Sequence, residues 1–326
     1  MTTGMIVTLT PNPSVDRTIE LTSALERGAV LRAARVTSQS AGKGVNISRA
    51  AVAAGVPTIA VLPAASDDPY VLELLRDGID CRPEPPAGDV RMNVTITEPD
   101  GTTTKINSPG ATAGPATLDR LRRALVQRAA QARWVVLAGS LPPGAPAEWY
   151  AEVVRDLRGL DVQVAVDTSG APLEAVFAHL DTAAPDLLKP NGEELASIAG
   201  GDPDAIEADP ELAASSAAVL VDRGVAAVLA TLGASGAVLV TSEGAWHATP
   251  PPTTVVSTVG AGDSSLFGYL LGSLRDAEPA ERLRLAVAYG SAAAGLPGTT
   301  IPTPDTVHPE LVDVAELSVP QPHRGL

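Results

Sequence analysis

The sequence predicts an α/β protein with a parallel sheet that helices cover on both faces, and with a second, smaller sheet attached to it. Short apolar runs alternate with alanine-rich stretches of helical character along most of the chain, as in chains that fold into βαβ units. Four further segments have apolar residues at every second position and no helix after them, so they indicate a separate sheet. The length of 326 residues, of which 45% are hydrophobic, suits one large domain with a small appendage.

The individual elements follow from the same patterns. Strands are short apolar runs bounded by turn residues, and helices are longer stretches rich in Ala, Leu and charged residues. Segments 237–241 and 246–248 are expected to form a hairpin. The predicted strands of the main sheet are 6–9, 58–62, 134–137, 162–166, 187–188 and 227–231, and the predicted helices are 46–54, 69–77, 117–132, 146–157, 213–222, 263–273 and 280–294.

The smaller sheet is predicted from two pairs of strands that lie far apart in the sequence. The first pair is 16–21 with 30–37, and the second is 91–98 with 102–107, joined by a turn that contains Asp100-Gly101. We expect a β lid, formed by about 12–39 and 89–109 and inserted in a single domain that spans 1–326. A small sheet alone exposes its edges and an apolar side, so pairing of two lids predicts a homodimer.

Composition excludes several classes of partner. The net charge is −15, so nucleic acid would be repelled, and aromatic residues make up only 3%, which leaves few rings to stack on bases. Cys81 is the single cysteine, which rules out an internal disulfide and a cysteine-rich metal site. We expect no signal peptide, because the start is neither basic nor strongly apolar, and no membrane span, because no run of about 18 apolar residues occurs. A cytoplasmic protein is expected.

The strongest chemical signal is the segment Gly260-Ala261-Gly262-Asp263, which directly precedes a predicted helix. Glycines let backbone N–H groups converge on an anion at a helix N-terminus. A carboxylate at that position would face the same anion, which makes sense if Asp263 takes a proton from an attacking hydroxyl while the amides hold a transferring phosphoryl group. The alternative is an Asp that caps a helix after a glycine turn.

A second glycine-rich segment, Gly42-Lys43-Gly44-Val45-Asn46, also opens a predicted helix. It is not a Walker A loop, because its spacing is too short and no Ser or Thr follows the lysine. Its glycines allow close approach of a ligand, Lys43 adds positive charge, and Asn46 adds a donor and an acceptor. An ordinary turn between strand and helix is the alternative.

Three further loops follow predicted strands, at the edge of an open α/β sheet where ligands bind. In Lys189-Pro190-Asn191, Asn191 and Glu194 are three apart at a helix start, which suits either Mg²⁺ held through water or a capping arrangement. Thr231 to Gly236 offers a turn for nucleotide phosphates, and Gly139 to Gly144 is another loop of this kind. One shared cleft explains these loops better than separate turns do.

Together these residues resemble the ribokinase-like sugar kinases of the PfkB family over nearly the whole chain. Segment 257–264 is similar to the family's second signature, which is highly specific, and 41–46 is similar to its first. Segment 9–13 with Asp16 resembles the family's opening. Segments 139–144 and 189–191 resemble the branch that acts on phosphorylated hexoses, namely 1-phosphofructokinase, the minor 6-phosphofructokinase and tagatose-6-phosphate kinase.

The resemblance implies a ribokinase-like three-layer α/β/α body with a β lid, which often mediates dimerisation. It implies ATP as phosphoryl donor, Mg²⁺, and a monovalent cation such as K⁺ near Ser257 and Val259. It assigns the catalytic base to Asp263 and the anion hole to Gly260, Ala261 and Gly262; sugar hydroxyls to Asp16, Gly42 and Asn46; the substrate phosphate to Lys43, Arg91 and Ser140; the ATP side to Lys189, Asn191, Thr231, Gly233, Gly236 and Ser257; and magnesium placement to Glu194.

Within this branch the motifs favour fructose 1-phosphate as the acceptor, converted to fructose 1,6-bisphosphate. Segment 28–31 lacks the lysine that minor 6-phosphofructokinases share there, and Lys43 resembles the 1-phosphofructokinase and tagatose-6-phosphate kinase pattern. Segments 288–293 and 297–299 resemble the 6-phosphofructokinase tail, so 6-phosphofructokinase and tagatose-6-phosphate kinase remain alternatives. A non-catalytic regulator that binds sugar or nucleotide is the alternative from another class, and the presence of Asp263 speaks against it.

Overall fold

The structure is a computed structural model that describes residues 4–318. Its main sheet has ten strands in the order β14-β13-β12-β11-β10-β9-β8-β1-β4-β5. The strands from β11 to β5 pair in parallel, and the hairpin β12–β13 with β14 extends the sheet antiparallel. The strands are β1 Ile6–Leu9, β4 Thr58–Pro63, β5 Asp80–Glu84, β8 Trp134–Ala138, β9 Gln163–Asp167, β10 Leu187–Leu188, β11 Ala227–Thr231, β12 Ala237–Thr241, β13 Gly244–Thr249 and β14 Asp313–Leu317.

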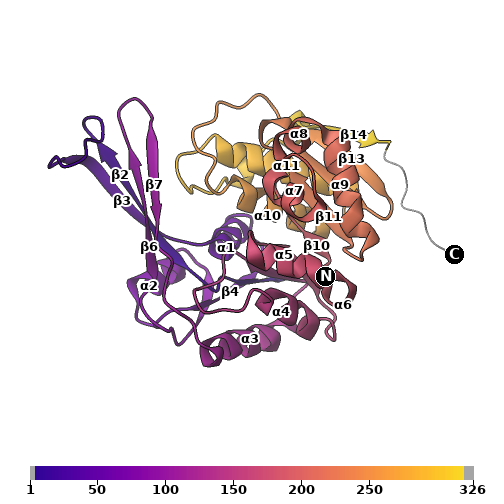
Figure 1. The fold of residues 1–326 in the computed structure, drawn as a ribbon, viewed down its shortest axis with the longest axis horizontal. Coiled ribbons are helices and arrows are strands. Elements are labelled where there is room, and N and C mark those ends of the chain that lie inside the picture. Colours follow the sequence, from indigo (N-terminus) through magenta and orange to yellow (C-terminus); the bar gives the residue numbers. More distant parts are fainter. Residues whose placement is uncertain (1–3, 319–326) are drawn as a thin grey trace.

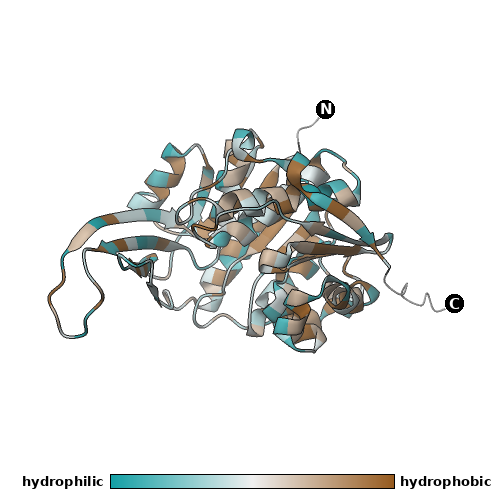
Figure 2. Cartoon of the chain, turned by 90° about the horizontal axis from the view of Figure 1, so that it is seen from above, coloured by the Kyte–Doolittle hydropathy of each residue, from teal (hydrophilic) through white to brown (hydrophobic). Residues whose placement is uncertain are grey.

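Helices cover both faces of this sheet, because successive residues of its buried strands point to opposite sides. Val7 of β1 belongs to a core with α3 (Pro115–Ala129), α4 (Trp149–Leu157), α5 (Ala171–Ala178), α6 (Leu180–Ala183), α7 (Gly192–Ala199), α8 (Pro203–Ala208) and α9 (Pro210–Asp222). Ile6 belongs to the opposite core, with α1 (Lys43–Ala53), α10 (Ala261–Leu274) and α11 (Pro279–Ala294). The three-layer α/β/α body is therefore as predicted. In the hydropathy view, hydrophobic colours concentrate on the sheet between its helices (Figure 2).

Most predicted elements agree with the structure to within a few residues. The elements that the patterns missed are short or lie at the sheet's edges. The strand β5 reads Asp-Cys-Arg-Pro-Glu, and its proline and charges are tolerated because it is an edge strand. The strand β14, at the other edge, is largely exposed and shows no apolar run. Helices α5, α7 and α8 have 8, 8 and 6 residues, too few for a clear helical period.

The smaller sheet, which we call the lid, has four strands in the order β3-β2-β6-β7 and extends away from the body (Figure 1). Its strands β2 and β6 pair in parallel although the 69 residues 22–90 separate them in the chain, and each has an antiparallel partner. Helix α2 (Pro69–Arg76) packs beside β3 at the base of the lid. The lid strands are β2 Ser14–Leu21, β3 Ala33–Ala41, β6 Arg91–Thr97 and β7 Thr103–Asn107.

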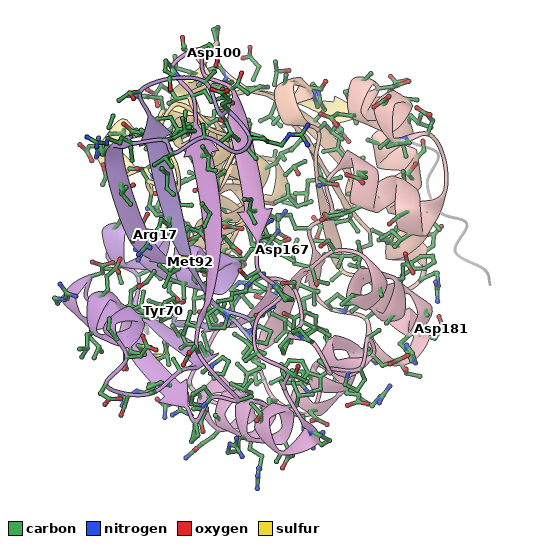
Figure 3. All side chains as sticks on the ribbon, turned by 60° about the vertical axis from the view of Figure 1, so that its left-hand side comes forward. Arg17, Tyr70, Met92, Asp100, Asp167 and Asp181 are labelled. Carbon is green, nitrogen blue, oxygen red and sulfur yellow. The ribbon has the colours of Figure 1, made fainter. Side chains whose placement is uncertain are left out.

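The register gives the lid two chemically different faces. Asp16 lies opposite Gln39 and Asn93, and this row defines the inner face, which is polar. On the other face, which we call the outer face, Ile19 lies opposite Val36 and Ile96. Arg17 and Met92 also belong to the outer face, and both are visible on the lid strands in Figure 3.

The inner face is the one turned toward the body. Thr299, in the loop after α11, donates a hydrogen bond from Oγ1 to Oε1 of Gln39 over 2.6 Å. Within residues 4–318, no helix is both long enough and apolar enough to cross a membrane.

The topology of the sheet fixes where a ligand can bind. The strand β1 is at the centre, with β4 on one side and β8 on the other, so the chain leaves β1 in one direction and later returns to its other side. At such a switch point the loops that follow neighbouring parallel strands diverge and leave a crevice at the carboxyl edge of the sheet. The lid starts directly after β1, because only 10–13 separate β1 from β2, and it therefore stands over this edge.

Candidate active site

Four polar side chains come from positions at or just after the carboxyl ends of the central strands. Asn12 follows β1, Ser140 follows β8, Asp167 ends β9 and Lys189 follows β10. The side-chain amide of Asn12 donates to the backbone oxygen of Pro109 over 3.0 Å and approaches Oγ of Ser140 at 3.5 Å. The loops after β1 and β8 therefore meet across the switch point, as the sheet order requires.

The catalytic turn is built on the start of α10. Gly260 has φ of 80°, a left-handed conformation that favours glycine, and it caps the helix that begins at Ala261. The first amides of a helix have no partner inside it, so those of Gly262 and Asp263 are available to an anion, whereas the amide of Ala261 makes a long hydrogen bond of 3.4 Å to the backbone oxygen of Thr258. Asp263, in this first turn, is only 6% exposed. The glycine turn and the carboxylate thus share one site.

The carboxylate of Asp263 has two kinds of neighbour. Burial raises its pKa, and the nearby charge of Asp167 raises it further. The ammonium group of Lys43 opposes this shift, and so does a hydrogen bond of 2.8 Å from Nδ2 of Asn46 to Oδ2 of Asp263. A carboxylate whose pKa burial raises is a better proton acceptor than an exposed one, provided that it stays ionised at the working pH. This balance suits a general base.

A buried ion-pair cluster lies beside this base. Asp167 is completely buried, and its Oδ1 accepts a hydrogen bond of 2.7 Å from Nζ of Lys43. Its Oδ2 lies 3.3 Å from Nζ of Lys189, which is itself 4% exposed. Although burial opposes ionisation, the two ammonium groups hold the pKa of Asp167 below its ordinary value. Figure 3 labels Asp167 near the centre of the molecule.

The glycines of the first signature let α1 approach β1 closely. Gly42 has φ of 136° and caps α1, and a Cβ added there would lie 2.6 Å from Cγ2 of Thr10. This approach brings the first turn of α1, with Lys43 and Asn46, over the carboxyl edge of the sheet. Lys43 contacts Asp167 and Asn46 contacts Asp263, so α1 supplies a polar side chain to each buried carboxylate.

A second group of polar side chains lies on the inner face of the lid. Asp16 accepts hydrogen bonds on Oδ1 from Ser14 over 2.9 Å and from Asn93 over 3.0 Å. Arg91 donates to the backbone oxygen of Ser108 over 2.9 Å, and the nearest charge that affects it is Asp16. Arg91 also lines a hollow at the base of the lid, and the residues that line this hollow do not include Asp263. Arg91 and Asp16 therefore mark an end of the site distinct from Asp263.

The residues expected on the nucleotide side have clear local roles. Asn191 and Glu194 form a reciprocal capping box at the start of α7, with hydrogen bonds of 2.8 and 2.9 Å, which is one of the two arrangements that their spacing allows. Thr231 forms an isolated β-bridge with Asn191, so the loop after β11 lies beside the loop after β10. Gly236 has φ of 90° and leaves no room for a side chain beside the backbone of Ala248.

Three polar residues at this site, Asp167, Asn93 and Gln39, belong to none of the sequence motifs. Asp167 follows a predicted strand directly, so its position at the carboxyl edge could have been inferred. Asn93 and Gln39 flank Asp16 only through the pairing of β2 with β6 and β3, which local patterns do not reveal. Their placement depends on the register of the lid.

The residues fit a metal–triphosphate ligand in one specific respect. Two buried polar atoms at this site, Asn46 Oδ1 and Ser264 Oγ, have no hydrogen-bond partner. Unpaired buried polar atoms of this kind occur where a ligand completes the site. Within the described part of the chain, no group of three His, Cys, Asp or Glu side chains is close enough to hold a metal ion. Mg²⁺ at nucleotide sites takes few protein ligands and binds mainly through phosphate and water.

This arrangement suits phosphoryl transfer, because a buried base, backbone amides and two lysines converge where negative charge would develop. Comparison with known proteins agrees with this class. A model of the pfkB family carbohydrate kinases matches residues 9–306. The chain is 36% identical to the 1-phosphofructokinase of Rhodobacter capsulatus over 92% of this chain and 93% of that protein. It is 34% identical to the 1-phosphofructokinase of Escherichia coli K12 over 88% and 90%.

A solved structure agrees with the fold as well. Phosphofructokinase-2 from Escherichia coli, in complex with potassium, matches with a TM-score of 0.84 at 27% identity and covers 93% of this chain and 96% of its own. The chain belongs to the pfkB family of carbohydrate kinases and is an ATP-dependent phosphotransferase. The family, the fold class and the type of enzyme predicted from the sequence are thereby confirmed.

The hydrogen bond from Asn46 gives a test of the base. Replacing Asn46 with Ala removes a donor that lowers the pKa of Asp263, while burial continues to raise it. Because the base acts only when ionised, the acidic limb of the kcat/KM profile is expected to shift to higher pH in Asn46→Ala. The profile of kcat/KM against pH measures this shift independently of any loss in the plateau.

Ser48→Ala is the matched control, because Ser48 lies on the same helix and bonds only to Thr8 and Thr58. Its acidic limb should coincide with that of the wild type. An unchanged acidic limb in Asn46→Ala would mean that the limb does not report Asp263.

Proposed function

We propose that this enzyme transfers the γ-phosphoryl group of ATP to the 6-hydroxyl of fructose 1-phosphate and releases fructose 1,6-bisphosphate and ADP. The observation that carries the proposal is the buried Asp263 in the glycine turn of α10, hydrogen-bonded to Asn46 of the other signature helix. The substrate follows from curated relatives named 1-phosphofructokinase, which are 34–36% identical over 87–92% of this chain.

Each step of the transfer has a residue suited to it. Asp263 accepts the proton of the acceptor hydroxyl, because its burial favours the neutral acid that results. The amides of Gly260, Ala261 and Gly262 bind the oxygens of the transferring group. Bound Mg²⁺ supplies positive charge to the triphosphate. Glu194, half-buried beside Asn191, is suited to contact that ion through water.

On the nucleotide side we propose Lys189, Asn191, Thr231, Gly233, Gly236 and Ser257. A monovalent cation such as K⁺ would bind near Ser257, whose Oγ accepts from the amide of Val259 over 3.2 Å. The support for this ion is the potassium complex of phosphofructokinase-2. Because the two substrates of such a kinase are metabolites of the cytoplasm, we propose that the enzyme acts there.

The acceptor's own phosphate is proposed to bind Arg91, with Ser140 nearby and Asp16 and Asn46 on the sugar hydroxyls. A guanidinium can donate two bonds to one phosphate. Nε of Arg91 is buried without a partner, which leaves a donor available. In a chain of net charge −15, such a free cationic donor on a polar lid face favours an anionic acceptor.

One observation favours a second candidate. Phosphofructokinase-2 from Escherichia coli has been solved with fructose-6-phosphate and is 27% identical to this chain, with a TM-score of 0.81. A 6-phosphofructokinase activity would use the same base and lid and would differ in which end of the sugar carries the phosphate. The higher identity to 1-phosphofructokinases favours the 1-phosphate.

We also propose that two copies associate through the outer faces of their lids. Val36 and Ile106 on this face are 53% and 57% exposed, and Met92 is 36% exposed. A contiguous apolar face on a small sheet without a covering helix favours burial against a second copy. A related phosphofructokinase-2 has been solved as a tetrameric inhibited form, which supports self-association in this family.

Replacing the base should separate catalysis from folding. Asp263→Asn is expected to keep nucleotide binding and to lose roughly 10²–10⁴-fold in kcat, the usual contribution of a positioned base. Asp276→Asn is the control, because Asp276 follows the same helix at its other end, with φ of 52°, a conformation that Asn tolerates. A kcat for Asp263→Asn within a few-fold of the wild type would refute the assignment of the base.

A panel of acceptors tests the substrate. The wild type is expected to show the highest kcat/KM with fructose 1-phosphate, compared with fructose 6-phosphate, tagatose 6-phosphate and free fructose. Arg91→Ala should lower the ratio of fructose 1-phosphate to free fructose by roughly 10–10²-fold, the effect of losing a charged hydrogen bond.

The control for this panel is Arg123→Ala, because Arg123 is exposed on α3, a helix of the body and not of the lid. It should leave the ratio unchanged. A preference of the wild type for fructose 6-phosphate would overturn the proposed acceptor but would leave the kinase assignment intact.

Charged substitutions on the lid test the dimer. The double variant Val36→Glu/Ile106→Glu is expected to be monomeric by light scattering at micromolar concentration, where the wild type is a dimer, because two like-charged faces repel. Leu72→Glu is the control, since Leu72 is similarly exposed, at 45%, but lies on α2 of the body. A wild type that is monomeric and fully active would contradict the proposal.

A further inference from the structure

The cations of this site fall into two separate groups. The carboxylates that act on Lys43 are Asp167, Asp263 and Glu194, whereas the carboxylate that acts on Arg91 is Asp16 of the lid. Nζ of Lys43 is committed to Asp167 by a hydrogen bond of 2.7 Å. Lys43 therefore belongs electrostatically to the end of the site that holds the base, although the sequence motifs suggested a role at the acceptor's phosphate.

Lys189 belongs to the same end. Its Nζ lies 3.4 Å from the position that a Cβ of Gly262 would take, so the ammonium group touches the glycine turn of α10. Both lysines share the two oxygens of Asp167, at 2.7 and 3.3 Å. One carboxylate thus holds two ammonium groups beside the glycine turn, where the amides of Gly262 and Asp263 lie.

From this geometry we infer that Asp167 is a positioning residue that holds Lys43 and Lys189 against the transferring phosphoryl group, so that Lys43 serves this group and not the ester phosphate of the sugar. The inference rests on the proposed kinase function and adds to it that different cations bind the two phosphate groups. Arg91 recognises the acceptor's phosphate, and the pair of lysines neutralises the group in transit. Asp167 itself touches neither substrate.

The need for Asp167 follows from charge. Without its carboxylate, two ammonium groups would face each other in a buried site and repel, and each would lose its partner. About a third of the Lys43 side chain is exposed, so it is free to turn away. Although burial opposes the charged form of Lys43, Asp167 and Asp263 raise its pKa, and loss of Asp167 would remove the stronger of these two effects.

Two variants test the two halves of the inference. Lys43→Met is expected to lower kcat on the order of 10²-fold, as for removal of a donor that stabilises the transition state. Its ratio of kcat/KM for fructose 1-phosphate to that for free fructose should stay at the wild-type value, whereas Arg91→Ala lowers this ratio. A ratio that falls in Lys43→Met as it does in Arg91→Ala would assign Lys43 to the ester phosphate and overturn the inference.

Asp167→Asn tests the positioning role through a readout that general destabilisation does not move. In the profile of kcat against pH, the alkaline limb of this variant is expected at lower pH than in the wild type, because Lys43 loses its proton more readily without the carboxylate. Thr168→Ala, which changes the next residue and leaves the lysine pair intact, should keep the wild-type limb. An unchanged alkaline limb and unchanged kcat in Asp167→Asn would refute the role.

Failure of the inference can be told from failure of the proposed substrate. If the wild type prefers another sugar phosphate, the proposed acceptor is wrong, and the ratio is then measured with that ester and its free sugar. A thermal-shift measurement of ADP binding verifies that each variant is folded. Lys43→Arg, which keeps a cation at all accessible pH values, should retain more of kcat than Lys43→Met does.

Discussion

The hydrogen bond between Asn46 and Asp263 joins the first turns of α1 and α10, which lie 217 residues apart in the chain. Both helices begin at a glycine with positive φ, and both lie on the same face of the main sheet. The two motifs that carry the chemistry are therefore useful only because one sheet holds both helix N-termini at one edge. A change in the packing of α1 on α10 would therefore alter the surroundings of Asp263.

Charge compensation is the second constraint. The chain carries a net charge of −15 and must nevertheless bind two anionic substrates. It does so by burying its cations near the carboxylates that keep them in position, with Lys43 and Lys189 on Asp167 and with Arg91 near Asp16. Beside the glycine turn, the two lysines balance two buried carboxylates, Asp167 and Asp263. The acidic chain thus keeps its cations where an anionic group would bind.

The catalytic turn, the alternation of strands with helices and the four lid strands could be predicted from the sequence because each is a local pattern. Gly260 to Asp263 is contiguous, and the period of two in β2 and β6 is visible within a few residues. Asp167 could not be recognised in this way, because a single Asp after a strand has many uses. Its importance appears only when Lys43 and Lys189, 124 and 22 residues away, are seen on its two oxygens. The role of such a residue depends on its tertiary contacts and cannot be predicted from local sequence patterns.

The lid and the catalytic turn are mechanically connected. Gln39 of β3 accepts a hydrogen bond from the hydroxyl of Thr299. The Cα atom of Thr299 lies 3.9 Å from the position that a Cβ of Gly260 would take. A displacement of β3 therefore acts on the loop that packs against the anion-binding glycine. On the same inner face, Asp16 and Asn93 move with the lid as one unit, because β2 and β6 are paired along 14–20. The side chains proposed to contact the sugar and the turn proposed to bind the phosphoryl group are thus connected through the lid sheet and Thr299, so a movement of the lid would change the geometry of the turn that carries Asp263.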